Sequence, residues 1–269
     1  MLWKALNKDQ FNDHMKSFNI QQELNRHSTH PFICSFEYIL ENEHRVYIIS
    51  ELLSGGELES LIKTKGTLSE ELAKFYTAQL VLAIGFLHSK DIVYRNLKTS
   101  AILINSDGYV KIGDFDWWGK LVKNTVSNSF VSTNEYQAPE IVNNEGHDKT
   151  IDWWALGVIM WQMLFEYEVV EDKKLHIPED SKISDEAKSL ISMLLEEERQ
   201  SRLGAQNDAD EILDHPFFSD IDKDALLNKD IKPPYIPFIH PKDPYYVANF
   251  NLDFADRAPR ESIINDIEN

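Results

Sequence analysis

The sequence YRNLKTSAILINSDGYVKIGDFD, residues 94–116, carries the pattern that decides the fold. Its middle holds two short apolar runs, 102–104 and 109–112, separated by a polar tetrapeptide that ends in Asp107-Gly108. An Asp-Gly pair between such runs is a strong signal for a β-hairpin. Polar side chains that can perform chemistry stand immediately before and after this predicted hairpin.

Regular elements are predicted on both sides of the hairpin. An apolar run over residues 45–53 predicts a strand, which a Ser-Gly-Gly turn closes. Ser69 is a good N-cap and begins a helical pattern that continues to about His88. Residues 152–164 are almost wholly apolar but too short to span a bilayer, which indicates a central helix buried on all sides. Ser184 caps a further helix.

Composition excludes several classes of partner. The chain has 269 residues, a net charge of −18 and a pI of about 4.8. Such an acidic surface repels phosphate backbones and anionic headgroups, so we expect no nucleic-acid partner and no membrane partner. The single cysteine, Cys34, leaves no disulfide to form within the chain, and no apolar run is long enough for a transmembrane span. With no signal peptide in the sequence, we expect an intracellular, cytoplasmic protein.

Three short motifs resemble those of eukaryotic protein kinases in their order and spacing. They are the segment 94–101, Asp114-Phe115-Asp116 and Ala138-Pro139-Glu140, which look like the catalytic loop, the metal-binding motif and the end of the activation segment. The segments 152–157, 202–204 and 215–218 narrow the resemblance to the AGC group, the relatives of the cyclic-nucleotide-dependent kinases. The tail agrees, because prolines and aromatic side chains are interleaved in it as in that group.

The resemblance implies an α+β, protein-kinase-like fold with two lobes. Residues 1–52 would form a reduced, β-containing small lobe that begins at the third strand and has no glycine-rich loop, since no G-x-G-x-x-G occurs in the sequence. Residues 53–218 would form a mainly helical large lobe. Residues 219–269 would form an AGC-type C-terminal tail that wraps the lobes.

Several positions match structural roles in the family. Glu140 and Arg202 match a buried ion pair, Asp152 matches the acid that ties the catalytic loop to the central helix, and Tyr94 and Phe115 match stacked apolar positions that link the lobes. Gln21 stands where the small-lobe helix carries the glutamate partner of a phosphate-binding lysine, and Glu23 is the alternative if the register is shifted. The neutral amide of Gln21 could bond that lysine but would not form an ion pair with it.

The positions that would perform the chemistry depart from the family pattern. Asn96 stands where kinases carry the catalytic aspartate, and an amide can orient a hydroxyl group but is too weakly basic to take its proton. Ala101 stands at a metal-ligand position and has no side-chain oxygen to offer. Lys98, which would neutralise the transferred phosphate, and Asp114, the other metal ligand, are present.

The resemblance also implies a nucleotide cleft. Lys4 looks like the phosphate-binding lysine of the third strand of the small lobe. The other candidate nucleotide-binding residues are Glu51, Glu57, Leu103 and Phe250.

Two further features concern regulation and partners. Ser129 stands where kinases of this group carry an activating phosphate, and Arg95 is the residue that would bind that phosphate. Residues 166–198 contain eleven acidic and four basic side chains, in a stretch that looks shortened relative to AGC kinases. A reduced small lobe would expose strand edges, so we expect a protein partner or larger assembly, basic where it meets this acidic face.

The losses at the chemical positions lead to the preferred hypothesis of a pseudokinase. Such a domain would transfer no phosphate and would act as a scaffold or regulatory subunit. It would need no cofactor, with ATP and Mg²⁺ bound only if residual nucleotide binding survives. Two alternatives are an active or weakly active ATP-dependent serine/threonine protein kinase and a nucleotide-binding module without turnover.

Overall fold

The computed structural model of the chain describes residues 2–7, 30–42, 45–113, 119–120, 134–165, 175, 177–240 and 249. Its strands are β1 (Leu2–Asn7), β2 (Phe36–Glu41), β3 (Arg45–Ser50), β4 (Ile92–Val93), β5 (Ile102–Ile104), β6 (Val110–Ile112) and β7 (Gly119–Lys120). Its α-helices are α2 (Leu58–Lys65), α3 (Glu70–His88), α4 (Pro139–Val142), α5 (Thr150–Leu164), α6 (Asp185–Leu194), α7 (Asp208–Leu213) and α8 (Lys223–Leu227). Short 3₁₀ turns are η1 (Thr99–Ala101), η3 (Asn134–Tyr136) and η4 (Pro216–Phe218). No helix within these described ranges is both long and apolar enough to cross a membrane.

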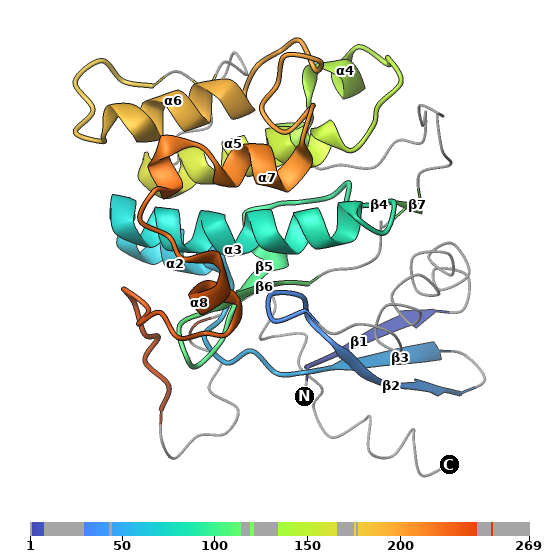
Figure 1. Cartoon of the computed structure of the whole chain (residues 1–269). Coiled ribbons are helices and arrows are strands. Elements are labelled where there is room, and N and C mark those ends of the chain that lie inside the picture. Colours follow the sequence, from blue (N-terminus) through green and yellow to red (C-terminus); the bar gives the residue numbers. More distant parts are fainter. Residues whose placement is uncertain are drawn as a thin grey trace.

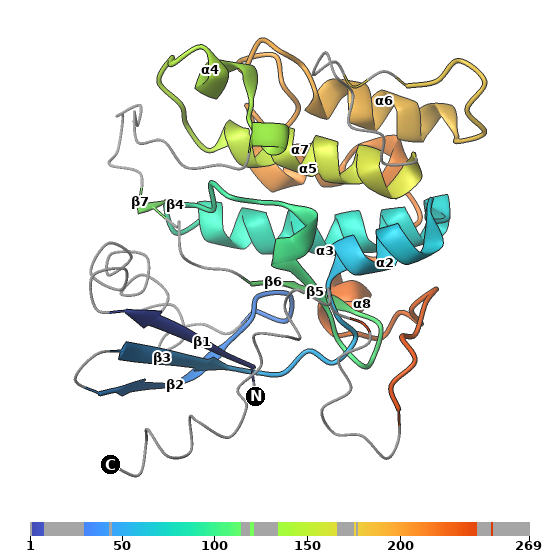
Figure 2. The same cartoon turned by 180° about the vertical axis from the view of Figure 1, so that it is seen from behind.

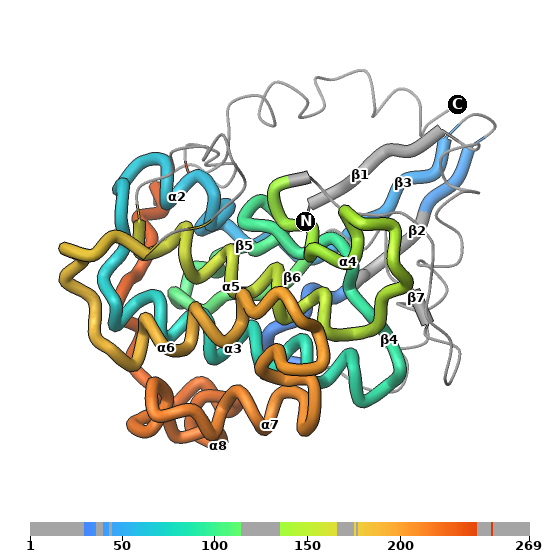
Figure 3. Tube along the Cα trace, turned by 90° about the horizontal axis from the view of Figure 1, so that it is seen from above, coloured from blue at the N-terminus to red at the C-terminus, as the bar shows by residue number. Residues whose placement is uncertain are grey.

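The helices stack in layers above a small sheet. Figure 1 shows α6 over α5, α5 over α3, and the β5–β6 hairpin beneath α3, with the β1–β3–β2 sheet below the hairpin. Figure 2 shows the same order from behind, with α4 at the far end of the helical part. Seen from above, the sheet projects to one side of the helices, and α7 and α8 lie along another side (Figure 3). The architecture is therefore a mixture of helices and small sheets.

The three-stranded sheet has β3 at its centre. Both β1 and β2 pair with β3 in antiparallel fashion, and Lys4 lies opposite Ile48 in the register. The turn between β2 and β3 is closed where the Arg45 N–H donates to Asn42 Oδ1 at 2.8 Å. The strand predicted over residues 45–53 ends three residues early, because the chain after Ser50 turns away from the sheet toward α2.

Local signals in the sequence explain α3. Ser69 accepts a hydrogen bond from the Leu72 N–H at 3.2 Å, as an N-cap should, and Glu70 and Glu71 lie in the first turn, where the helix dipole favours negative charge. The helix ends at His88, so the predicted helix is confirmed. Ser184 caps α6 in the same way, through the Ala187 N–H at 3.1 Å, and that prediction is confirmed as well.

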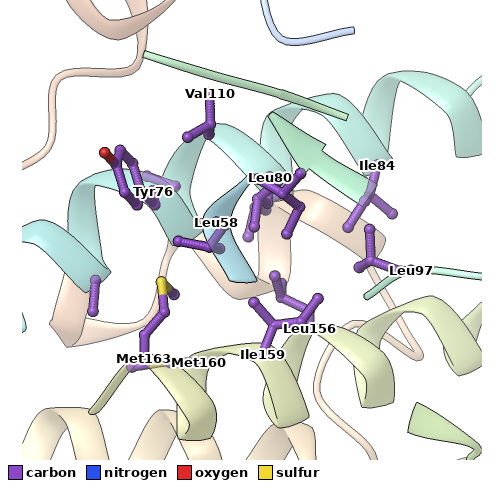
Figure 4. Close-up of a cluster of buried hydrophobic side chains, with 14 of the residues drawn as sticks. Leu58, Tyr76, Leu80, Ile84, Leu97, Val110, Leu156, Ile159, Met160 and Met163 are labelled. Atoms are coloured by element: carbon purple, nitrogen blue, oxygen red, sulfur yellow. The ribbon is translucent and has the colours of Figure 1, made fainter. Parts of the chain in front are cut away.

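The core lies between α3 and α5. All of α5 except Trp154 is buried, which confirms the prediction of a central helix. Figure 4 shows the side chains of α3 and α5 pointing toward one another. The labelled members are Leu58, Tyr76, Leu80, Ile84, Leu97, Val110, Leu156, Ile159, Met160 and Met163. Because Leu97 belongs to this core, the core packs against the loop between β4 and β5.

The tail packs on the β5–β6 hairpin, which the structure forms where the Asp-Gly signal predicts it. Lys229 Nζ donates to Asp107 Oδ2 at 2.8 Å, and the Tyr109 hydroxyl donates to the Ile231 carbonyl at 2.5 Å. Gly108 has φ +84°, and a Cβ there would lie 2.3 Å from the Tyr235 carbonyl oxygen. Glycine is therefore required at this contact by both the backbone conformation and the space.

Candidate functional site

The candidate site is built around the loop of residues 94–101, which runs from β4 to β5. Asp152, in the first turn of α5, accepts the Tyr94 N–H at Oδ2 and the Arg95 N–H at Oδ1, each at 2.8 Å. Arg95 has φ 71°, a left-handed conformation that costs a non-glycine residue free energy. The buried carboxylate of Asp152 thus holds the loop backbone in a strained conformation, one residue before Asn96.

A second layer of buried groups lies behind Asp152. His88, the last residue of α3, places Nε2 2.9 Å from Asp152 Oδ2 and Nδ1 2.8 Å from Asp208 Oδ1. Asp208 also accepts from Trp153 Nε1 at 3.0 Å and from Lys149 Nζ at 2.7 Å. The sequence reasoning missed both His88 and Asp208, and no local signal pointed to either.

The pKa values in this cluster follow from those contacts. Burial alone would lower the pKa of His88, but the hydrogen bonds from its ring to the Asp152 and Asp208 carboxylates outweigh burial and raise it. Burial would raise the pKa of Asp208, whereas His88 and Lys149 outweigh burial and lower it.

This raised pKa predicts how stability changes with pH. Because the pKa of His88 in the folded state lies above its unfolded value of about 6.5, its stabilisation is complete below that pH and is lost as pH rises through the folded pKa. Between the unfolded pKa and the folded pKa, the loss of this proton should lower the free energy of unfolding by about 1.4 kcal/mol for each unit that the pH rises. Urea unfolding at a series of pH values, with His88→Gln for comparison, measures this slope. An identical slope in both proteins would contradict the assignment.

The loop places three of the sequence-predicted residues close together along the chain. Asn96 is buried, Lys98 is half-buried at the start of η1, and Ala101 is buried at the end of η1. The Ala101 carbonyl accepts the Gly113 N–H at 2.8 Å, and the Tyr94 hydroxyl donates to the Gly113 carbonyl. Two hydrogen bonds, one at its N–H and one at its carbonyl, therefore attach Gly113, the residue before Asp114, to the loop.

The loop is also tied to the helical layer by neutral side chains. The Tyr136 hydroxyl lies 3.0 Å from Thr99 Oγ1 and donates to Gln162 Oε1 at 2.9 Å. All three residues are buried. Because Tyr136 belongs to η3 and Gln162 to α5, this chain of hydrogen bonds joins the loop to the segment that leads into α4. Sequence reasoning had singled out none of these three residues.

The candidate nucleotide-binding residues of the described chain surround the connection from β3 to α2. The Glu51 carboxylate binds Lys111 Nζ at 2.7 and 2.8 Å and accepts the Ser35 N–H at 2.8 Å, so its side chain is committed to the protein. Glu57 and Leu103 form an isolated antiparallel bridge. These contacts place the connection and β5 side by side, and nucleotide binding by these residues stays a prediction.

The tail reaches this connection at Asn249. Its side-chain amide donates to the Ser54 carbonyl at 3.3 Å and to the Phe238 carbonyl at 2.9 Å. Gly56 has φ +85°, and a Cβ there would lie 1.8 Å from the Asn249 carbonyl oxygen. Only glycine allows the tail to lie so close to the connection at this point.

The structure does not describe every predicted site residue. Gln21, Asp114, Phe115, Ser129 and Phe250 lie outside the described residues, and for Lys4 only the backbone of β1 is described. Their roles stay predictions. Within the described part of the chain, no group of three or more His, Cys, Asp and Glu side chains could hold a metal ion.

Glu140 and Arg202 lie in contact at the start of α4. Arg202 Nη1 and Nη2 lie 2.7 and 2.9 Å from the two carboxylate oxygens of Glu140, a bidentate pair. Arg202 also donates to the carbonyls of Glu196, Thr150 and Glu197, and its guanidinium lies over the Trp154 ring. The pair therefore joins α4, α5 and the turn after α6 in one buried contact.

The acidic face predicted over residues 166–198 is described only at residues 175 and 177–198. Glu179, Asp180, Asp185 and Glu186 are exposed there, ahead of the exposed run Glu196–Glu198. A basic partner for this face stays a prediction.

Comparison with known proteins gives a family match. Residues 1–218 match the model of the protein kinase domain. The chain is 36% identical over 238 residues to the serine/threonine-protein kinase sgk-1 of Caenorhabditis elegans, an alignment that covers 84% of this chain and 51% of that protein. It is 34% identical over 247 residues to Sgk1-B of Xenopus laevis, covering 87% of this chain and 56% of that protein. It is 36% identical over 262 residues to ribosomal protein S6 kinase 2 alpha of Gallus gallus, covering 90% of this chain and 34% of that protein.

These matches confirm the kinase-like α+β fold and the resemblance to AGC kinases. The chain spans about half the length of the first two of these relatives and about a third of the other. The same matches overturn the hypothesis of an inactive scaffold, because these relatives are named as kinases at 34–36% identity. That hypothesis was wrong because it gave the departures at the chemical positions and the missing glycine-rich loop more weight than the kinase resemblance along the whole chain.

Proposed function

Because the chain belongs to the protein kinase family, we propose that it is an ATP-dependent serine/threonine protein kinase with a slow chemical step. The observation that carries the proposal is the held catalytic loop, in which Asp152 bonds the Tyr94 and Arg95 N–H groups at 2.8 Å each. The left-handed backbone of Arg95 in this loop has a free-energy cost, and such strain concentrates at functional sites. The serine/threonine specificity comes from the names of its relatives.

The chemistry of phosphoryl transfer suits the residues that the loop carries. Its transition state is loose, so catalysis depends mainly on positioning and on neutralising charge. Lys98 would provide positive charge to the transferred phosphoryl group, and the Asn96 amide oxygen would accept a hydrogen bond from the acceptor hydroxyl and orient it. Without a carboxylate at residue 96 the hydroxyl proton has no strong base, which makes the step slow.

The donor set suits one magnesium ion better than two. Kinases use ATP and Mg²⁺, and we propose both here in place of the expectation of no cofactor. Asp114 would hold Mg²⁺ together with phosphate oxygens, since one or two carboxylates suffice for this ion when a nucleotide supplies the rest. The Ala101 methyl group cannot act as a ligand. When bound, Mg²⁺ neutralises the charge that develops on the β- and γ-phosphates.

The test is transfer of labelled phosphate from ATP to a basic peptide with one serine, in the presence of Mg²⁺. Lys98→Ala should lower kcat by about 10²-fold or more, because removing a group that stabilises transition-state charge typically has that effect. Lys90→Ala removes an exposed lysine close in sequence and should leave kcat unchanged. Equal rates for wild type and Lys98→Ala, at equal thermal midpoints, would contradict the proposal.

A further inference from the structure

The buried cluster behind the catalytic loop consists of His88 between the carboxylates of Asp152 and Asp208, and its hydrogen-bond donors and acceptors fix the charge of the histidine. His88 is completely buried at its side chain, and each of its two ring nitrogens lies within 2.9 Å of a carboxylate oxygen. A neutral imidazole has one N–H donor and one acceptor nitrogen, and only the imidazolium cation has two donors. Two ionised carboxylates on the same ring therefore require the cation.

The remaining partners of these carboxylates can only donate. Asp152 accepts from the Tyr94 and Arg95 backbone N–H groups, and Asp208 accepts from Trp153 Nε1 and Lys149 Nζ. A protonated Asp208 facing a neutral His88 would place an uncharged acid 2.7 Å from the lysine ammonium, which favours the ionised form instead.

The helix ends favour the same charges. His88 closes α3, where the dipole is negative, while Asp152 lies in the first turn of α5 and Asp208 begins α7, where the dipoles are positive. With His88 charged, two carboxylates face two cations, His88 and Lys149, so the charges of these four groups cancel. Two more groups lie near Asp152: the Arg95 guanidinium is a further cation, whereas burial lowers the pKa of His147 and keeps its ring neutral.

We propose that His88 is an imidazolium cation that positions the catalytic loop, by fixing the Asp152 carboxylate whose other hydrogen bonds hold Tyr94 and Arg95. His88 is a positioning residue, because it acts on the loop through Asp152. Its effect on turnover rests on the proposed kinase activity, whereas its charge and its effect on the loop backbone do not.

Nitrogen NMR of the full chain measures the charge directly. At about pH 8, well above the ordinary histidine pKa, the two ring nitrogens of His88 should both show the shift of protonated nitrogen. The His88 signals are those that disappear in His88→Gln, among the nine histidines of the chain. One protonated and one unprotonated ring nitrogen in the wild type would overturn the proposal.

Hydrogen exchange and kinetics measure the positioning. In His88→Gln the amides of Tyr94 and Arg95 should exchange at least about tenfold faster, and kcat should fall about tenfold or more with the KM for ATP unchanged, since misplaced reacting groups slow the chemical step. Adding Asp208→Asn should restore much of both losses, because it removes the buried carboxylate that the glutamine cannot satisfy. His215→Gln, at a ring that contacts Ser189 Oγ and the Phe217 N–H, is the matched control and should change neither quantity.

Two outcomes would count against the positioning role or the origin of the charge, and a third concerns the proposed function alone. The role is overturned if folded His88→Gln keeps both amides protected and, in an active protein, keeps its kcat. If His88→Gln does not fold, Asp208→Asn alone should turn His88 neutral at about pH 8; a ring still doubly protonated there would overturn the assignment of its charge to the two carboxylates. If the wild type shows no phosphate transfer, the proposed function fails, while the NMR and exchange results still decide this inference.

Discussion

Asn96→Asp should raise kcat for phosphate transfer by about 10²-fold or more. The carboxylate can accept the proton of the acceptor hydroxyl, and general-base catalysis contributes about 10²–10⁴-fold. The change fits the site, because asparagine and aspartate have the same shape and Asp152 holds the loop backbone immediately before residue 96 through the Tyr94 and Arg95 N–H groups. Steady-state rates with saturating ATP, Mg²⁺ and a serine peptide measure the gain.

Two further variants make this result specific. Asn143→Asp introduces the same charge at an exposed position and should leave kcat unchanged. Ala101→Asn adds a side-chain oxygen at the other metal-ligand position, so its benefit should appear mainly as a change in the Mg²⁺ dependence of the rate. A folded Asn96→Asp protein whose kcat does not rise would mean that the proton acceptor does not limit the reaction.

Glu140→Gln should destabilise the protein by about 3 kcal/mol. Removing one partner of a buried ion pair typically costs about 3–5 kcal/mol, because the other charge is left without compensation. Glu140 and Arg202 are only 4% and 1% exposed. The lower end of the range applies, since three backbone carbonyls still accept hydrogen bonds from Arg202 after the change.

The matched control is an exposed pair on α2. Lys63 Nζ lies 2.7 Å from Glu59 Oε1, a distance as short as in the buried pair, but the two side chains are 56% and 31% exposed. Glu59→Gln should therefore cost about 0.5 kcal/mol or less. Urea unfolding of the three proteins measures both differences. Equal losses for the two variants would show that burial does not set the value of the Glu140–Arg202 pair.

Local signals explain how much of the fold could be predicted. The Asp107-Gly108 turn, the Ser69 cap of α3 and the apolar run of α5 each act over a few residues, and the structure forms all three elements. The end of β3 was not predictable in the same way. The chain turns off the sheet there to meet α2, and the apolar pattern of residues 51–53 does not record that turn.

In the candidate site, too, residues that are contiguous in the sequence were predictable, and residues that meet only in the folded chain were not. The motif around Asn96 and Lys98 was evident because its residues are contiguous, and the resemblance supplied partners such as Asp152 for it. His88 and Asp208 are separated by 120 residues and meet only because α7 packs beside the end of α3, so no pattern in the sequence joins them. The inference of inactivity failed for a different reason: it judged the reaction from departures such as Asn96, Ala101 and the missing glycine-rich loop, whereas phosphoryl transfer depends largely on positioning.

The proposed kinase activity is tested by phosphate transfer to a serine peptide by four proteins in one assay: wild type, Lys98→Ala, Asn96→Asp and the double variant. Wild type should be faster than Lys98→Ala, Asn96→Asp should exceed wild type by about 10²-fold or more, and the double variant should lose most of that gain. If wild type and Asn96→Asp, as folded proteins, transfer phosphate no faster than Lys98→Ala, the chain is not the proposed kinase.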